Sequence, residues 1–261
     1  MQRDRAASED TACTRCRGTG FEIVESPDGV SRAVRCECAF SRTGETRLRH
    51  AGIPRRYENC TFANFHAVPR FPSLAAARAE AEDWAARWPA VDGQGLLLWG
   101  PPGTGKTHLA VAILHELARS KGADALFCEP RVLYKSLQAS YAPGAVTTET
   151  GVFGPLVTAD VLVLDDVGAG RPREWFRDVL YDVLADRYNA GLPVVLTTAC
   201  TVTGESERDD PGAGSVLGAL SLEQRLGDSL MSRLYEMCRF IRIEADDFRR
   251  RILSAEIRHD A

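Results

Sequence analysis

The stretch that most constrains this chain is LLLWGPPGTGKTHLA, residues 97–111, in which an apolar run ends in glycines and prolines and a helical pattern follows. It matches the spacing G-x-x-x-x-G-K-T through Gly100, Gly105, Lys106 and Thr107. Glycines let successive backbone N–H groups turn toward one anion, and a helix that begins near Gly105 directs the positive end of its dipole at the same charge. The pattern therefore predicts a phosphate-binding loop between a buried strand and a helix.

Lysine and threonine at the end of this loop predict that the anion is a nucleoside triphosphate with magnesium. Lys106 would reach the terminal phosphates, and Thr107 would coordinate Mg²⁺. The flanking residues supply the strand and the helix that this mechanism needs, because GLLLW is a buried-strand run and THLAVAILHELARS has apolar residues at helical spacing. The residues that we expect to bind the nucleotide, which we interpret as ATP, are Gly100, Pro101, Pro102, Gly103, Thr104, Gly105, Lys106, Thr107 and His108.

A second apolar run, in DVLVLDDVGAG, ends in two adjacent acids. Residues 161–164 are all apolar, as in a central parallel strand, and Asp165 and Asp166 follow at its carboxyl end, where open parallel sheets bind their ligands. Asp165 would hold Mg²⁺ through water, and Asp166 would orient or deprotonate the attacking water. Another buried strand, in LPVVLTTACT, ends in Thr197 and Thr198, one of whose hydroxyls would bond the attacking water or the terminal phosphate. We assign Thr198 to the catalytic site, although strand propensity alone also explains threonine there.

Strand and helix patterns alternate along the rest of the chain, which predicts an α/β fold with a parallel sheet flanked by helices on both faces. The predicted order is strand 96–99, helix 105–119, strand 125–129, helix 131–141, strand 161–165, helix 174–190, strand 194–198, helix 222–236 and strand 240–244. Two stretches read as loops, YAPGAVTTETG and the acidic TGESERDDPGAGS.

The N-terminal stretch CTRCRGTGFEIVESPDGVSRAVRCECAF contains four clustered cysteines, Cys13, Cys16, Cys36 and Cys38. A two-residue gap lets both thiolates of CTRC turn toward one ion, and CEC puts its two cysteines on the same side of an extended strand. FEIVE and SRAVR read as a hairpin that brings the two pairs together. Four thiolates favour a closed structural Zn²⁺ site; the alternatives are a metal-free cysteine cluster and an iron–sulfur site.

The other four cysteines stand singly among apolar neighbours, and we expect small buried side chains without chemistry at Cys60, Cys128, Cys200 and Cys238. A length of 261 residues fits one medium domain with a small appendage. We therefore divide the chain into a zinc module at residues 1–45, a linker with the leading part of the core at 46–95, and the nucleotide-binding core at 96–261.

The formal net charge of −4 provides no overall field that would attract a polyanion, so nucleic-acid contact would depend on a local basic surface. Arg131, Lys135, Arg171 and Arg173 are the candidates for such a surface. No apolar run approaches the roughly 18 residues of a membrane span, and the first residues lack the apolar stretch of a secretion signal. We expect a cytoplasmic protein that does not bind a membrane.

Five stretches together resemble the DnaC/IstB family of AAA+ ATPases, and within it the bacterial helicase loaders of the DnaC and DnaI type. They are GIPRRYENCTFANF at residues 52–65, GPPGTGKTHLA, LVLDDVGAG, RLGDSLMSRL and a terminal DDFRR. The resemblance implies a P-loop AAA+ sheet that lacks a full C-terminal lid, because only ADDFRRRILSAEIRHDA follows the last predicted strand.

The resemblance also implies roles for two arginines. Arg233, in LMSRL, matches the arginine finger that reaches a neighbouring subunit's nucleotide, and Arg249, in DDFRR, matches the sensor arginine that touches phosphate in the same chain. A planar guanidinium suits phosphate oxygens. The alternative is that both are surface arginines in an arginine-rich chain.

Loaders of this kind imply an ATPase that forms an ATP-dependent homo-oligomer and acts on a replicative DnaB-type helicase and single-stranded DNA. We assign the helicase contact to the zinc module. Two departures from the family pattern predict slow hydrolysis: Ala199 stands where the family often has asparagine, and Asp166 where many AAA+ proteins have glutamate. The alternative functions are an IstB-like transposition helper on duplex DNA and a nucleotide-gated adaptor that scarcely hydrolyses ATP.

Overall fold

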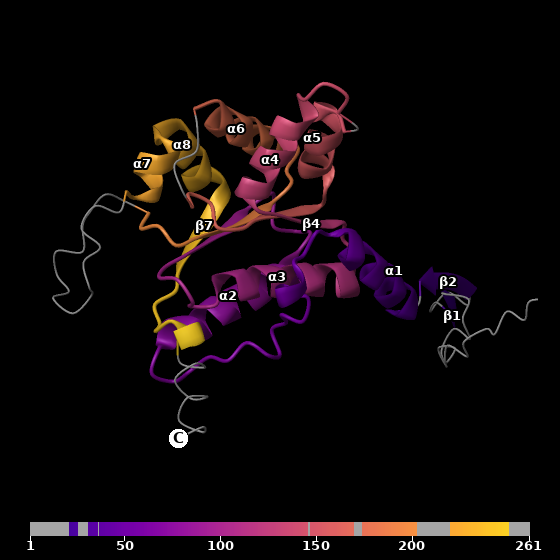
Figure 1. Cartoon of the computed structure of the whole chain (residues 1–261). Helices are drawn as coiled ribbons and strands as arrows, with labels where there is room; N and C mark the ends of the chain where they lie inside the picture. The colour runs from indigo at the N-terminus through magenta and orange to yellow at the C-terminus, as the bar shows by residue number, and fades with distance from the viewer. Residues whose placement is uncertain are drawn as a thin grey trace, which may run out of the picture.

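The computed structural model describes residues 21–25, 31–35, 37–145, 147–169, 174–202 and 220–250, with side chains described from residue 44 onward. At the centre of this part of the chain is a parallel sheet of five strands in the order β4-β5-β6-β3-β7 (Figure 1). The strands are β3 (Gly95–Trp99), β4 (Ala125–Cys128), β5 (Val161–Leu164), β6 (Val194–Thr198) and β7 (Cys238–Arg242). The predicted parallel sheet is therefore confirmed.

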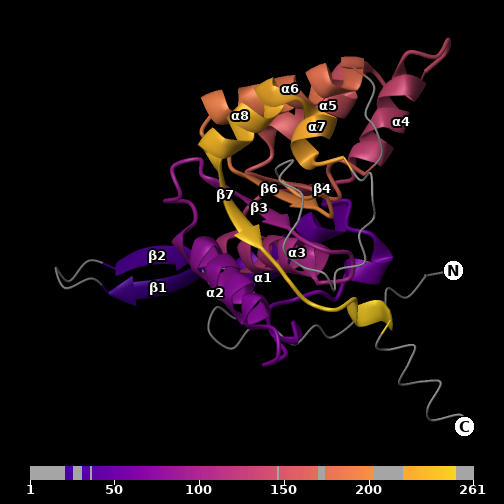
Figure 2. The same ribbon diagram turned by 90° about the vertical axis from the view of Figure 1, so that its left-hand side faces the viewer.

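Helices cover both faces of this sheet (Figures 1 and 2). On one face lie α2 (Pro72–Arg87) and α3 (Lys106–Glu116). The other face is covered by α4 (Pro130–Ser140), α5 (Glu149–Thr158), α6 (Glu174–Asn189), α7 (Leu222–Leu226) and α8 (Asp228–Met237). None of the helices in the described ranges is both long and apolar enough to span a bilayer.

Successive side chains of each strand point to opposite faces of the sheet, so each strand packs against both helical layers. In β5, Val161 and Val163 join the apolar cluster with α2 and α3, whereas Leu162 and Leu164 join the cluster with α4 to α8. All four side chains are buried. Each such side chain stabilises the fold by about 1.5–3 kcal/mol, which explains why this strand is apolar at every position rather than at alternate ones.

The structure differs from the predicted elements at several helices. The predicted helix 222–236 is divided into α7 and α8, because Gly227 has a φ of 86° and ends α7. Helix α5 begins inside one predicted loop, where the Thr148 hydroxyl accepts a hydrogen bond from Gly151 N–H at the helix start. Helix α3 continues into a π-helical turn, η2 (Leu117–Lys121). Helix α2 was not predicted. A helix is recognised in a sequence by its apolar periodicity. In α5 this periodicity is weakened by glycines and a proline, and in α2 it is weakened by the alanine-rich sequence.

The predicted N-terminal hairpin is confirmed by strands β1 (Phe21–Glu25) and β2 (Ser31–Arg35), which pair antiparallel with Ile23 opposite Ala33. The extended strand expected around Cys38 is wrong, because α1 (Glu37–His50) already includes that residue. Cysteines 13, 16 and 36 lie outside the described residues, and the side chain of Cys38 is not described either. Among the residues that are described, no group of three or more His, Cys, Asp and Glu side chains is suited to hold a metal. The zinc site stays a prediction.

Helix α1 crosses the domain boundary that we predict at residue 45 and packs against the core. Gly44 lies directly against the backbone of Ala118 in η2, where a side chain at position 44 would collide with the Ala118 carbonyl oxygen. Helix α1 is therefore in contact with the end of the phosphate-loop helix.

The four scattered cysteines have free thiols and pack in or beside the apolar clusters. Cys238 is buried, whereas Cys60, Cys128 and Cys200 are half-buried. Burial raises the pKa of Cys60, and burial together with the charge of Glu129 raises the pKa of Cys128 to about 12. These two thiols are therefore protonated and unreactive at neutral pH.

Candidate active site

A cavity of about 550 Å³ opens at the carboxyl ends of β3, β5 and β6. Its walls come from the phosphate loop (100–107), from a leading segment (52–71) and from a terminal segment that follows β7 (243–250). The predicted nucleotide-binding residues that line it are Pro102, Gly103, Thr104, Gly105, Lys106, Thr107 and His108, joined by Asp165 and Asp166 from the end of β5. Gly100 and Pro101 do not line the cavity, but their carbonyl groups bind the loop lysine.

Two loop glycines allow close approach of the other two walls. Gly105 has a φ of 93°, and a Cβ there would lie 2.7 Å from Cε2 of Phe65 in the leading segment. Gly103 has a φ of 77°, and a Cβ there would overlap the carboxylate of Asp247 in the terminal segment. The glycines are thus required both for backbone conformation and for contact with segments distant in sequence.

The ammonium group of Lys106 is buried at the base of the loop. Its Nζ donates hydrogen bonds to Gly100 O at 2.8 Å and to Pro101 O at 2.6 Å. Burial lowers the pKa of Lys106 to about 8, and the charge of Asp166 opposes that change. The lysine therefore lies where an incoming phosphate would compensate its unfavourable burial.

The side chains of Thr107, Asp165 and Thr197 form one hydrogen-bonded row. Thr107 Oγ1 donates to Asp165 Oδ1 at 2.8 Å, and Thr197 Oγ1 donates to the same oxygen at 2.6 Å. Asp165 is only 4% exposed, and burial raises its pKa, while the two hydroxyl donors oppose the rise. Hydroxyl and carboxylate oxygens next to a phosphate loop are the ligand type that Mg²⁺ takes, so the predicted residues Thr107 and Asp165 fit this ion.

Asp166 follows Asp165 in the chain and has an unusual backbone conformation. Its φ is 58°, in the left-handed region that residues with a side chain rarely adopt. Its N–H donates to Thr197 Oγ1 at 2.9 Å, and its carboxylate is exposed to the cavity. Strain of this kind is common in functional sites, where the surrounding structure holds it.

The structure corrects our assignment of Thr198. Its hydroxyl is buried, donates to Val167 O at 2.6 Å and accepts from Cys200 N–H at 3.1 Å, and it does not line the cavity. Thr197 is the threonine of the site. Parallel pairing of Leu164 with Leu196 sets Asp165 level with Thr197, and this register cannot be read from either strand alone.

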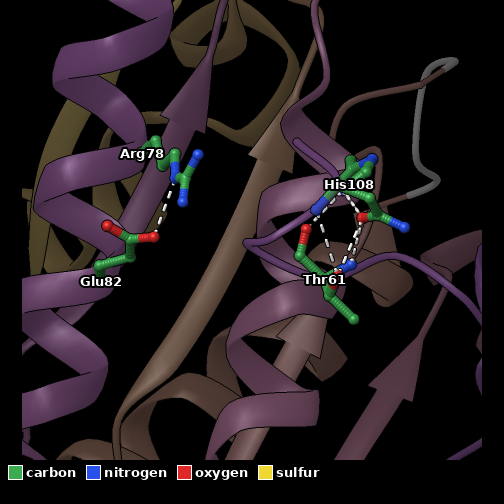
Figure 3. A network of polar contacts seen from close by, with 5 residues as sticks. Thr61, Arg78, Glu82 and His108 are labelled. Carbon is green, nitrogen blue, oxygen red and sulfur yellow. Dashed lines mark hydrogen bonds and ion pairs between the residues drawn. The ribbon is translucent and has the colours of Figure 1, made fainter. Parts of the chain in front are cut away.

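A polar network joins the phosphate-loop helix to the leading segment (Figure 3). His108 Nε2 lies 2.9 Å from Thr61 O and 3.0 Å from Asn64 Oδ1, so the proton resides on Nε2 and is shared between these acceptors. Burial lowers the pKa of His108, which keeps the ring neutral. The ring of Phe65 packs edge-on against His108 at 5.3 Å between centroids. Figure 3 also shows an ion pair on α2, between Arg78 Nε and Glu82 Oε1 at 2.8 Å, apart from this network.

The leading segment also supplies an apolar wall, which our sequence reasoning did not predict. Its lining side chains are Tyr57, Phe65, Val68 and Phe71, and Leu74 of α2 extends the same wall. Aromatic and aliphatic groups suit the flat faces of a nucleotide base. The only sequence signal was the cluster of aromatic residues after position 56.

The structure places the two predicted arginines differently. Arg249 lines the cavity from the terminal segment, and its charge acts on Lys106. Arg233 lies away from this cavity on α8, with its guanidinium 4.6 Å from the ring centroid of Tyr188 and its Nη1 3.3 Å from Glu236 Oε2. A contact between Arg233 and a nucleotide would have to involve another copy of the chain.

Two further lining residues bear on catalysis. Ala199 lines the cavity, so the position that often carries an asparagine has no hydrogen-bonding side chain here. Glu129, which we did not predict, adds another carboxylate to the wall and forms a 3.9 Å ion pair with Arg56 of the leading segment.

Comparisons with known proteins agree with this geometry. The family model described as "IstB-like ATP binding protein" matches residues 85–255, which is more than half of the chain. Protein XkdC of the phage-like element PBSX of Bacillus subtilis (strain 168) is 24% identical over 246 residues, covering 90% of this chain and 84% of the relative. Rv3427c, an insertion-sequence protein of Mycobacterium tuberculosis, is 31% identical over 163 residues, covering 58% of this chain and 60% of the relative.

Solved structures show the same fold. The crystal structure of the DnaC helicase loader matches with a TM-score of 0.61 and 28% sequence identity, covering 73% of this chain and 100% of that one. This chain therefore belongs to the IstB/DnaC family of ATP-binding proteins and has the α/β fold of its P-loop AAA+ relatives.

Proposed function

We propose that this protein hydrolyses ATP at the cavity between β3, β5 and β6. One observation supports the proposal most: Lys106, Thr107, Asp165 and Asp166, which come from two separate stretches of the sequence, converge on the same cavity next to an apolar wall. A buried ammonium, a hydroxyl–carboxylate pair and an exposed carboxylate are the groups that phosphoryl transfer to water requires.

Each residue has a separate role in this mechanism. Lys106 exchanges its bonds to the loop carbonyls for bonds to the terminal phosphate oxygens, and Arg249 adds a second positive charge from the same chain. Thr107 and Asp165 would hold Mg²⁺, which would neutralise phosphate charge. Asp166 orients the attacking water and accepts its proton as the new P–O bond forms and the bond to the ADP oxygen breaks.

The binding step is tested by calorimetry with ATP and Mg²⁺. Lys106→Ala should weaken ATP binding by about 100-fold or more, because hydrogen bonds from a charged group to phosphate are lost. Lys121→Ala, which changes an exposed lysine at the end of η2, is the matched control and should bind as the unmodified protein does. Equal affinity in the two variants would contradict the assignment of the loop.

We infer further that the ATPase acts on a replicative helicase of the DnaB type and on single-stranded DNA, as an ATP-dependent homo-oligomer, with the N-terminal cysteine module as the helicase contact. The similarity to a protein named as the DnaC helicase loader supports this function. Purified protein should contain zinc, and the paired changes Cys13→Ser and Cys16→Ser should remove helicase capture without changing ATP affinity. A helicase that fails to bind in every nucleotide state would contradict the inference.

A second candidate is a transposition helper that assembles on duplex DNA. The family model and the 31% identity to an insertion-sequence protein favour it. Filaments on duplex DNA in the presence of ATP, with no helicase capture, would select this function. ATP binding without turnover, with or without single-stranded DNA, would instead select a nucleotide-gated adaptor, which the alanine at position 199 favours.

A further inference from the structure

The hydroxyl of Thr197 contacts both acids of the site at once. Thr197 is 1% exposed, at the end of the central strand β6. Its Oγ1 donates to Asp165 Oδ1 at 2.6 Å and accepts from Asp166 N–H at 2.9 Å. A hydroxyl has one donor and two acceptor sites, so both bonds form without competition.

The bond to Asp166 supports a strained backbone. Strand β5 ends at Leu164, and two residues later Asp166 adopts its φ of 58°. Backbone hydrogen bonds hold the chain on either side of it, from Asp165 N–H to Cys128 O at 2.9 Å and from Val167 N–H to Thr197 O at 2.8 Å. Between them, the N–H of Asp166 bonds to a side chain instead of a strand partner.

The left-handed turn decides where the Asp166 carboxylate points. An extended residue at this position would continue β5 and direct its side chain across the sheet, whereas the turn exposes the carboxylate at the cavity. The same hydroxyl holds the neighbouring Asp165 through Oδ1, the oxygen that also accepts from Thr107. The relative placement of the two carboxylates therefore depends on one buried oxygen atom.

We propose that Thr197 is a positioning residue for hydrolysis, whose hydroxyl sets the two carboxylates for their separate tasks without touching the substrate. The proposal rests on the proposed ATPase function. It differs from the role in which a strand-end hydroxyl bonds the attacking water, because both hydrogen bonds of Thr197 that the structure shows lead to Asp165 and Asp166.

Two substitutions separate the hydroxyl from the bulk of the side chain. Thr197→Val keeps the shape and removes both hydrogen bonds, whereas Thr197→Ser keeps the hydroxyl and removes only a methyl group. We expect Thr197→Val to lower kcat by about 100-fold, which is the effect of misplacing a general base. Its ATP affinity should stay within about threefold of that of the unmodified protein. Thr197→Ser should keep kcat within about threefold of the unmodified protein.

The measurements are steady-state turnover, ATP affinity by calorimetry and thermal unfolding of each variant. A merely structural role predicts the opposite order, in which both variants lose stability and affinity together and serine does not rescue turnover. That result, or turnover by Thr197→Val within about threefold of the unmodified protein, overturns the proposal. If Thr197→Val does not fold, we expect the same loss of kcat and the same ATP affinity for Thr197→Ala. If neither variant folds while Thr197→Ser does, the proposal is also overturned.

The outcome also separates this inference from the proposed function. An unmodified protein that binds ATP but does not turn it over overturns both. An active unmodified protein with an active valine variant overturns only the role of Thr197.

Discussion

At the scale of single residues, the site contains ionisable groups whose pKa values are shifted by burial. Lys106 and Asp165 are almost fully covered, and burial shifts the pKa of each toward its neutral form. Hydrogen bonds from two hydroxyls favour the ionised form of Asp165, whereas the partners of Lys106 are loop carbonyls, the Thr104 hydroxyl and nearby carboxylates. The lysine is therefore the group whose charge depends on ligand and pH.

ATP affinity should fall as the pH rises through about 8. Lys106 loses its proton near this pH in the free protein, while bound phosphate favours the ammonium form, so binding above pH 8 must take up a proton. Affinity should be level below pH 8 and decrease by up to about tenfold per pH unit above it. Calorimetry in buffers of different ionisation enthalpy measures the proton uptake, and its absence at pH 9 would contradict the shifted pKa.

At the scale of elements, three segments distant in sequence enclose one cavity. The terminal segment touches Gly103 of the phosphate loop through the Asp247 carboxylate and through Phe248 N–H, which donates to Gly103 O at 3.1 Å. Asp247 also accepts from Arg249 N–H at 3.1 Å, as a cap for the turn that presents this arginine. The same short segment thus brings a repulsive and an attractive charge to the phosphates.

Asp247→Asn should tighten ATP binding by about threefold to tenfold. The change removes a negative charge next to the phosphate loop, and asparagine keeps the side-chain oxygen that caps the turn. Asp178→Asn, which changes an exposed acid on α6 that does not line the cavity, is the matched control. Affinity measured at low and moderate salt should differ most between the two variants at low salt. Weaker binding by Asp247→Asn would show that the carboxylate holds Arg249 in place rather than repelling phosphate.

A buried arginine connects elements on the other face of the sheet. Arg187 of α6 is 0% exposed and donates to Leu156 O, Ala159 O and Pro193 O at 2.7–2.9 Å. Burial lowers its pKa to about 10, so it remains charged at neutral pH. The guanidinium thereby ties α6 to the end of α5 and to the start of β6.

Arg187→Met should lower the free energy of unfolding by about 3 kcal/mol, because three carbonyl groups lose their donors in a dry environment. Arg119→Met, at an exposed position of η2, should change it by less than about 0.5 kcal/mol. Chemical denaturation at neutral pH gives both values. Equal stability of the two variants would mean that water replaces the arginine.

At the scale of the whole molecule, two arginines of this chain line the cavity, Arg56 on the leading segment and Arg249 on the terminal segment. Arg249 lines the cavity, while Arg233 lies on α8 over Tyr188. Tyr188 is one of the exposed large side chains in the described part of the chain, and it lies directly under the Arg233 guanidinium. A second copy of the chain that places its α8 against this cavity would complete the site, as the resemblance implies.

Arg233→Ala should bind ATP normally but lose DNA-stimulated hydrolysis, by about 1000-fold if the arginine acts as a finger. Lys106→Ala should also be inactive, for lack of nucleotide. A mixture of the two variants should regain activity, because the intact loop of one copy would face the intact arginine of the other. A mixture that stays inactive although the proteins co-assemble would contradict a role in trans, and full activity of Arg233→Ala alone would contradict any role.

The sequence by itself determined the local parts of this protein. The glycine spacing around Lys106 and the uniform apolar run before Asp165 predicted a loop and a buried strand, because backbone conformation and burial on both faces restrict residue choice at each position. The hairpin and most strands of the sheet followed from the same short-range patterns.

Only the tertiary structure decided which distant groups meet. The pairing of β5 with β6 selected Thr197 over Thr198, because one residue along a strand reverses the direction of a side chain. The apolar wall from the leading segment and the position of Asp247 at Gly103 likewise depend on contacts between segments far apart in the chain. Such contacts come from the packing of whole elements, and no local periodicity encodes them.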